Sequence, residues 1–216
     1  MVHKDWSTSM SVEAQDALRT LIQTGAITVG DVLIVEDVAA RLALPIHDVA
    51  LAAANLEAFG LLEAAGESYV VRGLDGESVR RFIEMRLEIE VRVVETLARV
   101  ASGEDIAKLR YENDALRLAA LRDERVKFME VSARFHQTLA ERANFLQGAR
   151  VLRNWEDFQK VVGARALEKP QAMLEAIIEH EDLIGLIESG DSTGAASAMR
   201  DHLTRTFDRA REAVAA

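Results

Sequence analysis

Over the first 75 residues, the spacing of apolar positions predicts three short helices followed by a hairpin. The predicted elements are helices over 11–24, 35–42 and 48–59 and strands over 61–63 and 68–71. Pro45 suits the turn before the third helix, and Gly66 suits the turn between the strands. Three helices and a hairpin in this order make a winged helix-turn-helix, which we assign to residues 1–75.

From residue 76 onward the pattern is helical throughout. Helices are expected over 77–101, 104–121, 124–143, 145–165, 171–189 and 192–213, separated by short breaks that include the pair Lys169 and Pro170. One example of an apolar stripe comprises Leu174, Ile177, Ile178, Leu183, Ile184 and Ile187, most of which we expect in the core. The expected fold is dominated by α-helix, with a six-helix antiparallel bundle over residues 76–216.

The composition supports this fold and excludes several classes of protein. Of the 216 residues only two are proline and 5% are aromatic, which disfavours an all-β fold. The chain has no cysteine, so disulfides, thiolate metal sites and cysteine nucleophiles are excluded. No apolar run approaches the ~20 residues that span a bilayer, and the N-terminus is too polar for a secretory signal. We expect a cytoplasmic protein with no membrane partner.

The charge is distributed unevenly along the chain. The net charge is −10, and residues 1–75 contribute four basic and eleven acidic residues, a net charge of −7. A winged helix normally meets DNA, and a negative surface is repelled by phosphates. DNA therefore remains a partner that the fold suggests and the charge disfavours.

The order of elements and several local motifs resemble the GntR family of bacterial transcription regulators, in the branch with an all-helical FCD effector domain. The C-terminal resemblance rests on Glu84, Arg86 and Glu90, on Gly103 to Leu109, on Phe135 and His136, on Ala143 and Asn144, on Glu179 and His180, and on Gly190 to Leu203. A weaker resemblance covers Leu33, Glu36, Ala39, Leu42, Leu56, Glu57, Gly60 and Leu61. It implies a homodimeric regulator that responds to a small-molecule carboxylate.

The same resemblance implies a metal site at His136, His180 and His202. Three neutral imidazoles suit a divalent Zn, Fe, Ni or Cu ion and leave coordination positions open. Where the family usually has Asp, four residues before the first His, this chain has Ser132, so the site lacks one charged ligand. The alternative is that these histidines are buried and satisfied by carboxylates such as Glu90 or Glu84.

The effector site implied by the resemblance centres on Arg86, together with Glu84, Glu90 and Asn144. A guanidinium can donate two parallel hydrogen bonds to a carboxylate. Spacing alone equally allows Arg86 to pair with Glu90 one helical turn later. Asn144 stands at a helix break, where a cap or turn role is more typical.

The predicted recognition helix lacks the arginines with which the family contacts DNA. Ile46 and Ala50 occupy their positions, and a bidentate arginine is the commonest reader of guanine. The remaining candidates for DNA contact are Arg41, His47, Asn55 and Arg72.

Three functions remain open from the sequence. The first is a ligand-responsive transcription regulator. The second is a metal-dependent enzyme or small-molecule-binding protein whose winged helix no longer binds DNA. The third is a co-regulator that binds another protein through the altered helix.

Overall fold

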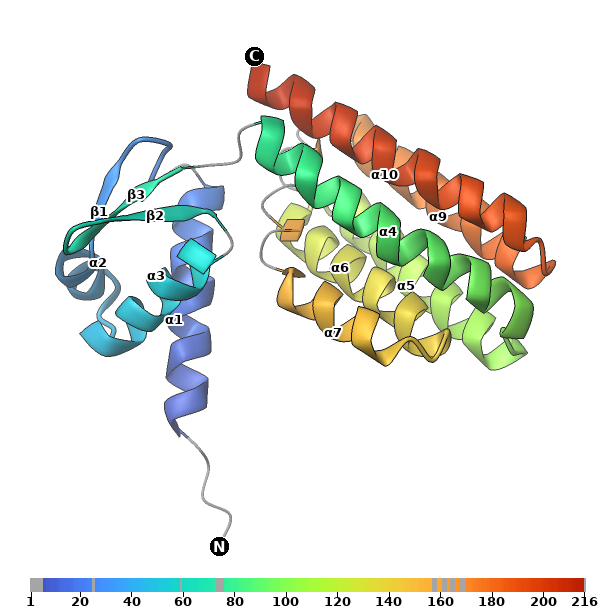
Figure 1. Ribbon diagram of the computed structural model, residues 1–216, viewed down its shortest axis with the longest axis horizontal. Helices are drawn as coiled ribbons and strands as arrows, with labels where there is room; N and C mark the ends of the chain where they lie inside the picture. Colours follow the sequence, from blue (N-terminus) through green and yellow to red (C-terminus); the bar gives the residue numbers. More distant parts are fainter. Residues whose placement is uncertain are drawn as a thin grey trace, which may run out of the picture. The chain divides into compact units, whose positions relative to one another are not determined.

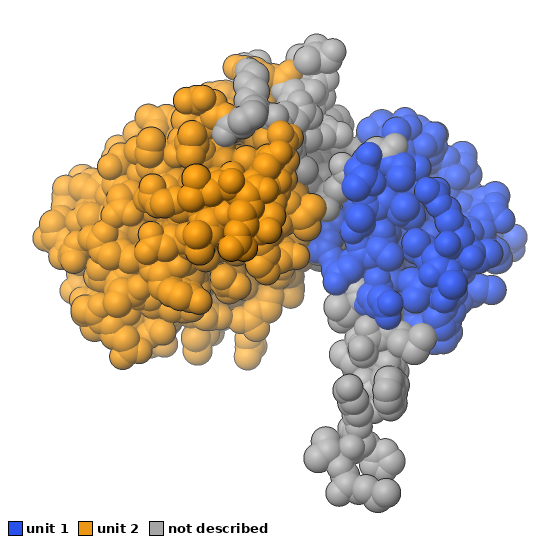
Figure 2. Space-filling view, turned by 180° about the vertical axis from the view of Figure 1, so that it is seen from behind, with its two compact units in different colours: residues 1–75 blue, residues 76–216 orange. Residues whose placement is uncertain are grey.

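The computed structural model describes residues 6–24, 26–58, 60–72, 76–156, 159–160, 163, 166–167 and 170–215. The chain divides into two compact units, residues 1–75 and residues 76–216, coloured separately in Figure 2. Within the described residues, no helix has both the length and the apolar character needed to cross a membrane.

The first unit is a winged helix. Its elements are α1 (Trp6–Gln23), β1 (Val32–Ile34), α2 (Val35–Leu42), α3 (Ile46–Ala58), β2 (Leu62–Ala65) and β3 (Ser68–Val71). The strands form an antiparallel sheet in the order β1-β3-β2. Ala65 pairs with Ser68, and Gly66 in the intervening turn has φ of +68°, a conformation that glycine adopts without steric cost. Leu18 of α1 and Leu56 of α3 are fully buried in the core of this unit.

The second unit is a bundle of antiparallel helices (Figure 1). Its elements are α4 (Gly76–Val100), α5 (Gly103–Leu121), α6 (Arg125–Arg142), α7 (Leu146–Asn154), α9 (Pro170–Glu188) and α10 (Ser192–Ala215). Helix α4 packs along α10, and α5 packs between α6 and α9. Phe128 of α6 and Ile177 of α9 belong to a buried apolar cluster that joins α5, α6 and α9. The expectation of a winged helix followed by a helical bundle is confirmed.

The start of α5 illustrates how local sequence sets an element boundary. The Ser102 hydroxyl accepts a hydrogen bond from the Asp105 backbone at 3.2 Å, and the Asp105 carboxylate accepts one from the Ser102 backbone at 2.9 Å. This reciprocal capping satisfies two backbone donors that a helix leaves unpaired. The boundary therefore follows directly from the residue types.

Some expected elements differ from the structure. Helix α1 begins at Trp6 rather than near residue 11, and the short strand β1 was not predicted because three residues carry too little periodicity. The single helix expected over 145–165 is interrupted: α7 ends at Asn154 with Trp155 as its C-cap, and the described residues that follow at 156, 159–160 and 163 are again helical. Phe59 and Lys169, at predicted element ends, lie outside the described residues.

The apolar stripe on α9 is only partly core. Ile177, Leu183, Ile184 and Ile187 are buried, whereas Leu174 and Ile178 are exposed. The two exposed residues lie four positions apart and so share one helical face. Periodicity marks an apolar face but does not say whether a neighbouring helix covers it.

Candidate metal and effector site

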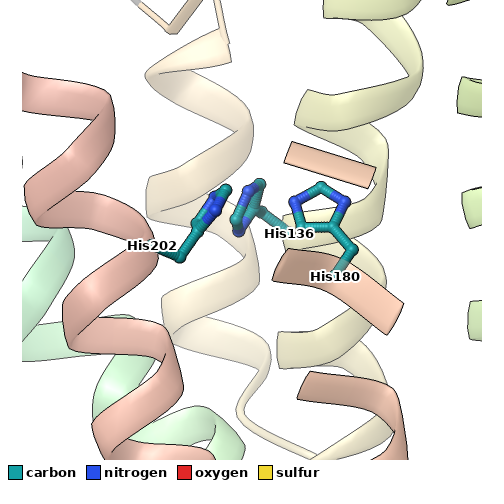
Figure 3. A group of neighbouring side chains, drawn as sticks. All are labelled: His136, His180 and His202. Atoms are coloured by element: carbon teal, nitrogen blue, oxygen red, sulfur yellow. The ribbon is translucent and has the colours of Figure 1, made fainter. Parts of the chain in front are cut away.

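Three histidines from three helices converge inside the bundle. His136 lies on α6, His180 on α9 and His202 on α10, and their rings face one another (Figure 3). One nitrogen from each ring lies within 4.8 Å of the others, and all three side chains are buried. Antiparallel packing places these positions at one level of the bundle, a recurrent arrangement for metal sites between helices.

Two of the histidines are oriented by buried carboxylates. The Nδ1 atom of His202 is hydrogen-bonded to Oε2 of Glu179 at 2.7 Å, and Nδ1 of His136 lies 2.5 Å from Oε2 of Glu90. A carboxylate at Nδ1 favours the tautomer that carries its proton there, which leaves the Nε2 lone pair free. Carboxylates placed in this way are typical outer neighbours of histidines that bind metals.

His180 lacks any polar partner. It is 0% exposed, and neither Nδ1 nor Nε2 makes a hydrogen bond with a described residue. Its ring stacks on Phe135 with centroids 4.2 Å apart, which fixes its plane. Burying an unsatisfied polar group costs about 1–3 kcal/mol, so this side chain is poised for a ligand that the described residues do not supply.

The electrostatics of the site keep His136 and His180 neutral. Burial lowers the pKa of His136 to about 4, with the Glu90 carboxylate opposing and the Arg86 charge reinforcing the shift. Burial also lowers the pKa of His180 well below its ordinary value, and the neighbouring His202 and His136 add to this effect. Neutral imidazole is the form that binds a metal ion.

The two carboxylates remain ionised. Burial acts to raise the pKa of Glu90, but the charges of Arg86 and His136 outweigh it and lower that pKa to about 2. Burial likewise opposes the shift at Glu179, where the hydrogen bond from His202 and the contact with Arg209 lower the pKa to about 2.

These shifts predict that the metal-free protein loses stability in acid. A histidine whose pKa is lower in the folded state takes up protons preferentially when unfolded, so folding weakens as pH falls from 6.5 towards 4. The depressed pKa values of the carboxylates extend the loss from pH 4.5 towards 2. Each such histidine contributes a slope of up to about 1.4 kcal/mol per pH unit. Urea unfolding of chelator-treated protein at pH 7.5, 6.0 and 5.0 checks this, and equal free energies of unfolding at all three would contradict it.

His136 and His202 border a small chamber of about 50 Å³, whereas His180 does not line it. Ser132 lines it, one helical turn before His136, as do Arg86 from α4 and Arg209 from α10. Arg209 was not singled out from the sequence, although its position seven residues after His202 places it on the same face of α10. The lining also includes Phe128, Gln159, Gly163, Ala166, Leu167, Ala176, Thr206 and His202.

Two residues of the expected effector site lie elsewhere. Glu84 is exposed and pairs with Arg80 four residues earlier on α4, since its position does not share the inward face of Arg86 and Glu90. Asn144 is exposed between α6 and α7 with φ of +55°, the left-handed conformation that asparagine tolerates at turns. Neither residue lines the chamber, so the structure does not bring Glu84 or Asn144 to the expected effector site. Glu90 does not line it either, but contacts Arg86 and His136 beside it.

The candidates for DNA contact are dispersed over the winged helix. Arg72 donates from Nε to Glu63 at 2.5 Å, and the Asn55 amide donates to Gln15 of α1 at 3.2 Å. His47 and Arg41 are exposed. Arg72 already pairs with Glu63 and Asn55 is engaged within the unit, so a phosphate contact by either side chain would compete with these interactions.

Comparison with known proteins places the chain in a family. Residues 81–205 match the FCD domain model. Escherichia coli McbR/YncC is similar in structure at a TM-score of 0.75 and 17% identity, covering 94% of this chain and 97% of that one. A putative transcriptional regulator GntR from Rhodococcus sp. RHA1 gives a TM-score of 0.73 at 17% identity, covering 96% and 99%. No curated protein matches the chain significantly. The FCD match spans more than half of the 216 residues, and the protein therefore belongs to the FCD domain family, with the fold of GntR-type regulators.

Proposed function

We propose that the protein is a ligand-responsive transcription regulator whose helical unit holds a divalent transition metal and a small carboxylate. His136, His180 and His202 would hold the metal, and Arg86 would face the carboxylate. The metal supplies a Lewis-acidic centre with open positions that a carboxylate oxygen can fill. A homodimer is the assembly in which such a regulator would act.

The burial of His180 without a partner is the observation that carries this proposal. If the three histidines were only structural, each would be expected to have a hydrogen-bond partner, as His202 does. An imidazole with two unpaired nitrogens beside two other imidazoles is better explained by a metal ligand set.

The connection between the site and the first unit runs through α4. This helix begins at Gly76, directly after residues 1–75, and carries Arg86, which lines the chamber, and Glu90, which contacts His136. A ligand that engages Arg86 more strongly in one position of α4 than in another would shift the equilibrium between them. Effector binding would thus act on the winged helix through the covalent connection at the start of α4.

Metal binding predicts a rise in thermal stability. A ligand that binds only the folded state stabilises it by about 2.7 kcal/mol at a free concentration one hundred times its Kd. For a chain of this size that corresponds to roughly 5–10 °C in Tm. Calorimetry with added Zn²⁺ and with chelator measures the difference, and coincident unfolding curves would count against the site.

A second candidate function, a metal-dependent enzyme or small-molecule-binding protein without DNA binding, is favoured by the surface of α3. Ile46 and Leu51 are exposed there, at the helix that would enter the major groove. Only Arg41, Arg72 and the buried Arg19 carry positive charge in the described part of this unit. No acid, base or nucleophile of the chamber is assigned to a reaction.

Selection of bound genomic fragments at low salt separates the two functions. The regulator proposal predicts specific enrichment that is lost when Arg41 and Arg72 are changed to alanine. With two phosphate-neutralising residues, log K should fall with log salt at a slope of about −1.8 for each winged helix engaged. A family member with its recognition arginines serves as the control, and failure to enrich any fragment while that control succeeds would favour the second candidate.

A further inference from the structure

We propose that the chamber is specific for a small dianion, such as a short dicarboxylate, bound beside the metal, and that Ser132 sets this requirement. This inference rests on the proposed function, because it presumes the metal at the three histidines. It adds the charge of the ligand, which neither the fold nor the histidines specify.

The balance of buried charge points to two negative charges on the ligand. Arg86 pairs with Glu90 at 2.5 Å, and Arg209 lies 3.3 Å from Glu179, so two guanidiniums face two carboxylates. A histidine that holds a metal ion does so as neutral imidazole. The two guanidiniums and the two carboxylates then sum to no net charge before the divalent ion is counted. With the ion the excess is +2, and a buried uncompensated charge is strongly unfavourable.

Two cationic groups of the chamber retain unused hydrogen-bonding capacity. Arg86 is 5% exposed, and its Nη2 atom makes no hydrogen bond with any described residue. The buried Nε atom of Arg209 is also without a partner in the described part of the chain. Arg86 already gives Nε to Glu90, so its remaining donors can meet a ligand carboxylate that Glu90 does not reach.

The size of the chamber limits the ligand to a few atoms. A volume of about 50 Å³ corresponds to roughly four water molecules. Such a space suits a short diacid better than a long-chain or aromatic acid. Both negative charges must then lie close together, within reach of the metal and of the two guanidiniums.

Ser132 determines the charge that the ligand must carry, because its side chain lies in the chamber wall one helical turn from His136. Its hydroxyl is neutral, whereas a carboxylate at this position would reach the same space and supply one of the two negative charges. A single substitution at Ser132 should therefore move the preference from dianion towards monoanion.

The test compares two probes of nearly equal size that differ in charge. Malonate and malonamate are titrated by calorimetry into the full-length protein loaded with one equivalent of Zn²⁺, at pH 7.5. We expect malonate to bind at least tenfold more tightly than malonamate. In Ser132→Asp the ratio should fall below threefold, and Zn²⁺ alone should bind more tightly. Ser132→Asn introduces a side chain of nearly the same size as that of Asp but without its charge, so this variant should keep the preference for malonate.

The outcomes separate this inference from the proposed function. If the wild-type protein binds no Zn²⁺, both are overturned. If it binds Zn²⁺ but binds malonate and malonamate equally, the dianion inference alone is overturned. A malonate preference that persists unchanged in Ser132→Asp would likewise overturn the role given to Ser132.

Discussion

Replacing His180 by alanine is expected to weaken Zn²⁺ binding by more than about 100-fold. Changes to the outer neighbours of a metal site already cost 10–100-fold, and this substitution removes a ligand itself. His136 and His202 would remain, too few to hold the ion alone in a small closed site. Competition against a chelator of known affinity measures the loss.

His47→Ala provides the matched control for this prediction. Its side chain is 82% exposed in the winged helix, far from the chamber in sequence, so Zn²⁺ affinity should stay unchanged. Circular dichroism of both metal-free variants establishes that each is folded. Equal Zn²⁺ affinities for folded His180→Ala and His47→Ala would show that His180 is not a ligand.

Replacing Glu90 by glutamine is expected to destabilise the metal-free protein by about 3–5 kcal/mol. Glu90 is 1% exposed and pairs with the buried Arg86, so the substitution leaves a buried guanidinium without its counter-charge. The same change removes the carboxylate beside Nδ1 of His136 and should weaken metal binding by roughly 10–100-fold.

Glu84→Gln is the control on the same helix. Glu84 also pairs with an arginine four residues away, but both side chains are largely exposed, where ion pairs contribute little. Urea unfolding of both variants at pH 7.5 gives the comparison. Similar free energies of unfolding for Glu90→Gln and Glu84→Gln would contradict the role given to the buried pair.

The fold was predictable where a residue type determines its local conformation. Gly66 marks the hairpin turn, and the range 35–42 was predicted for α2 without error. One helix was predicted over 145–165 because helical periodicity continues past Asn154 and does not reveal the break at Trp155 that ends α7. Most of the apolar stripe on α9 is core as expected, but the stripe does not reveal that a neighbour leaves Leu174 and Ile178 uncovered.

The site was only partly predictable for a related reason. The resemblance named His136, His180 and His202, and the structure brings them together. Arg209 was missed because no local motif marks it, although its spacing from His202 is compatible with one face of α10. Helical spacing places Glu90, four residues after Arg86, on the same face as Arg86, and places Glu84, two residues before it, on another face. Only the packing of α4 within the bundle decides that the face with Arg86 and Glu90 points inward.

The most direct test of the metal site is element analysis combined with X-ray absorption spectroscopy on protein purified without an affinity-tag metal. The account predicts one Zn, Fe, Ni or Cu ion per chain after reconstitution. For Zn, nitrogen neighbours should lie at about 2.0–2.1 Å, with the outer scattering of imidazole rings. A metal content that stays far below one per chain after reconstitution, or a spectrum without imidazole scattering, would contradict it.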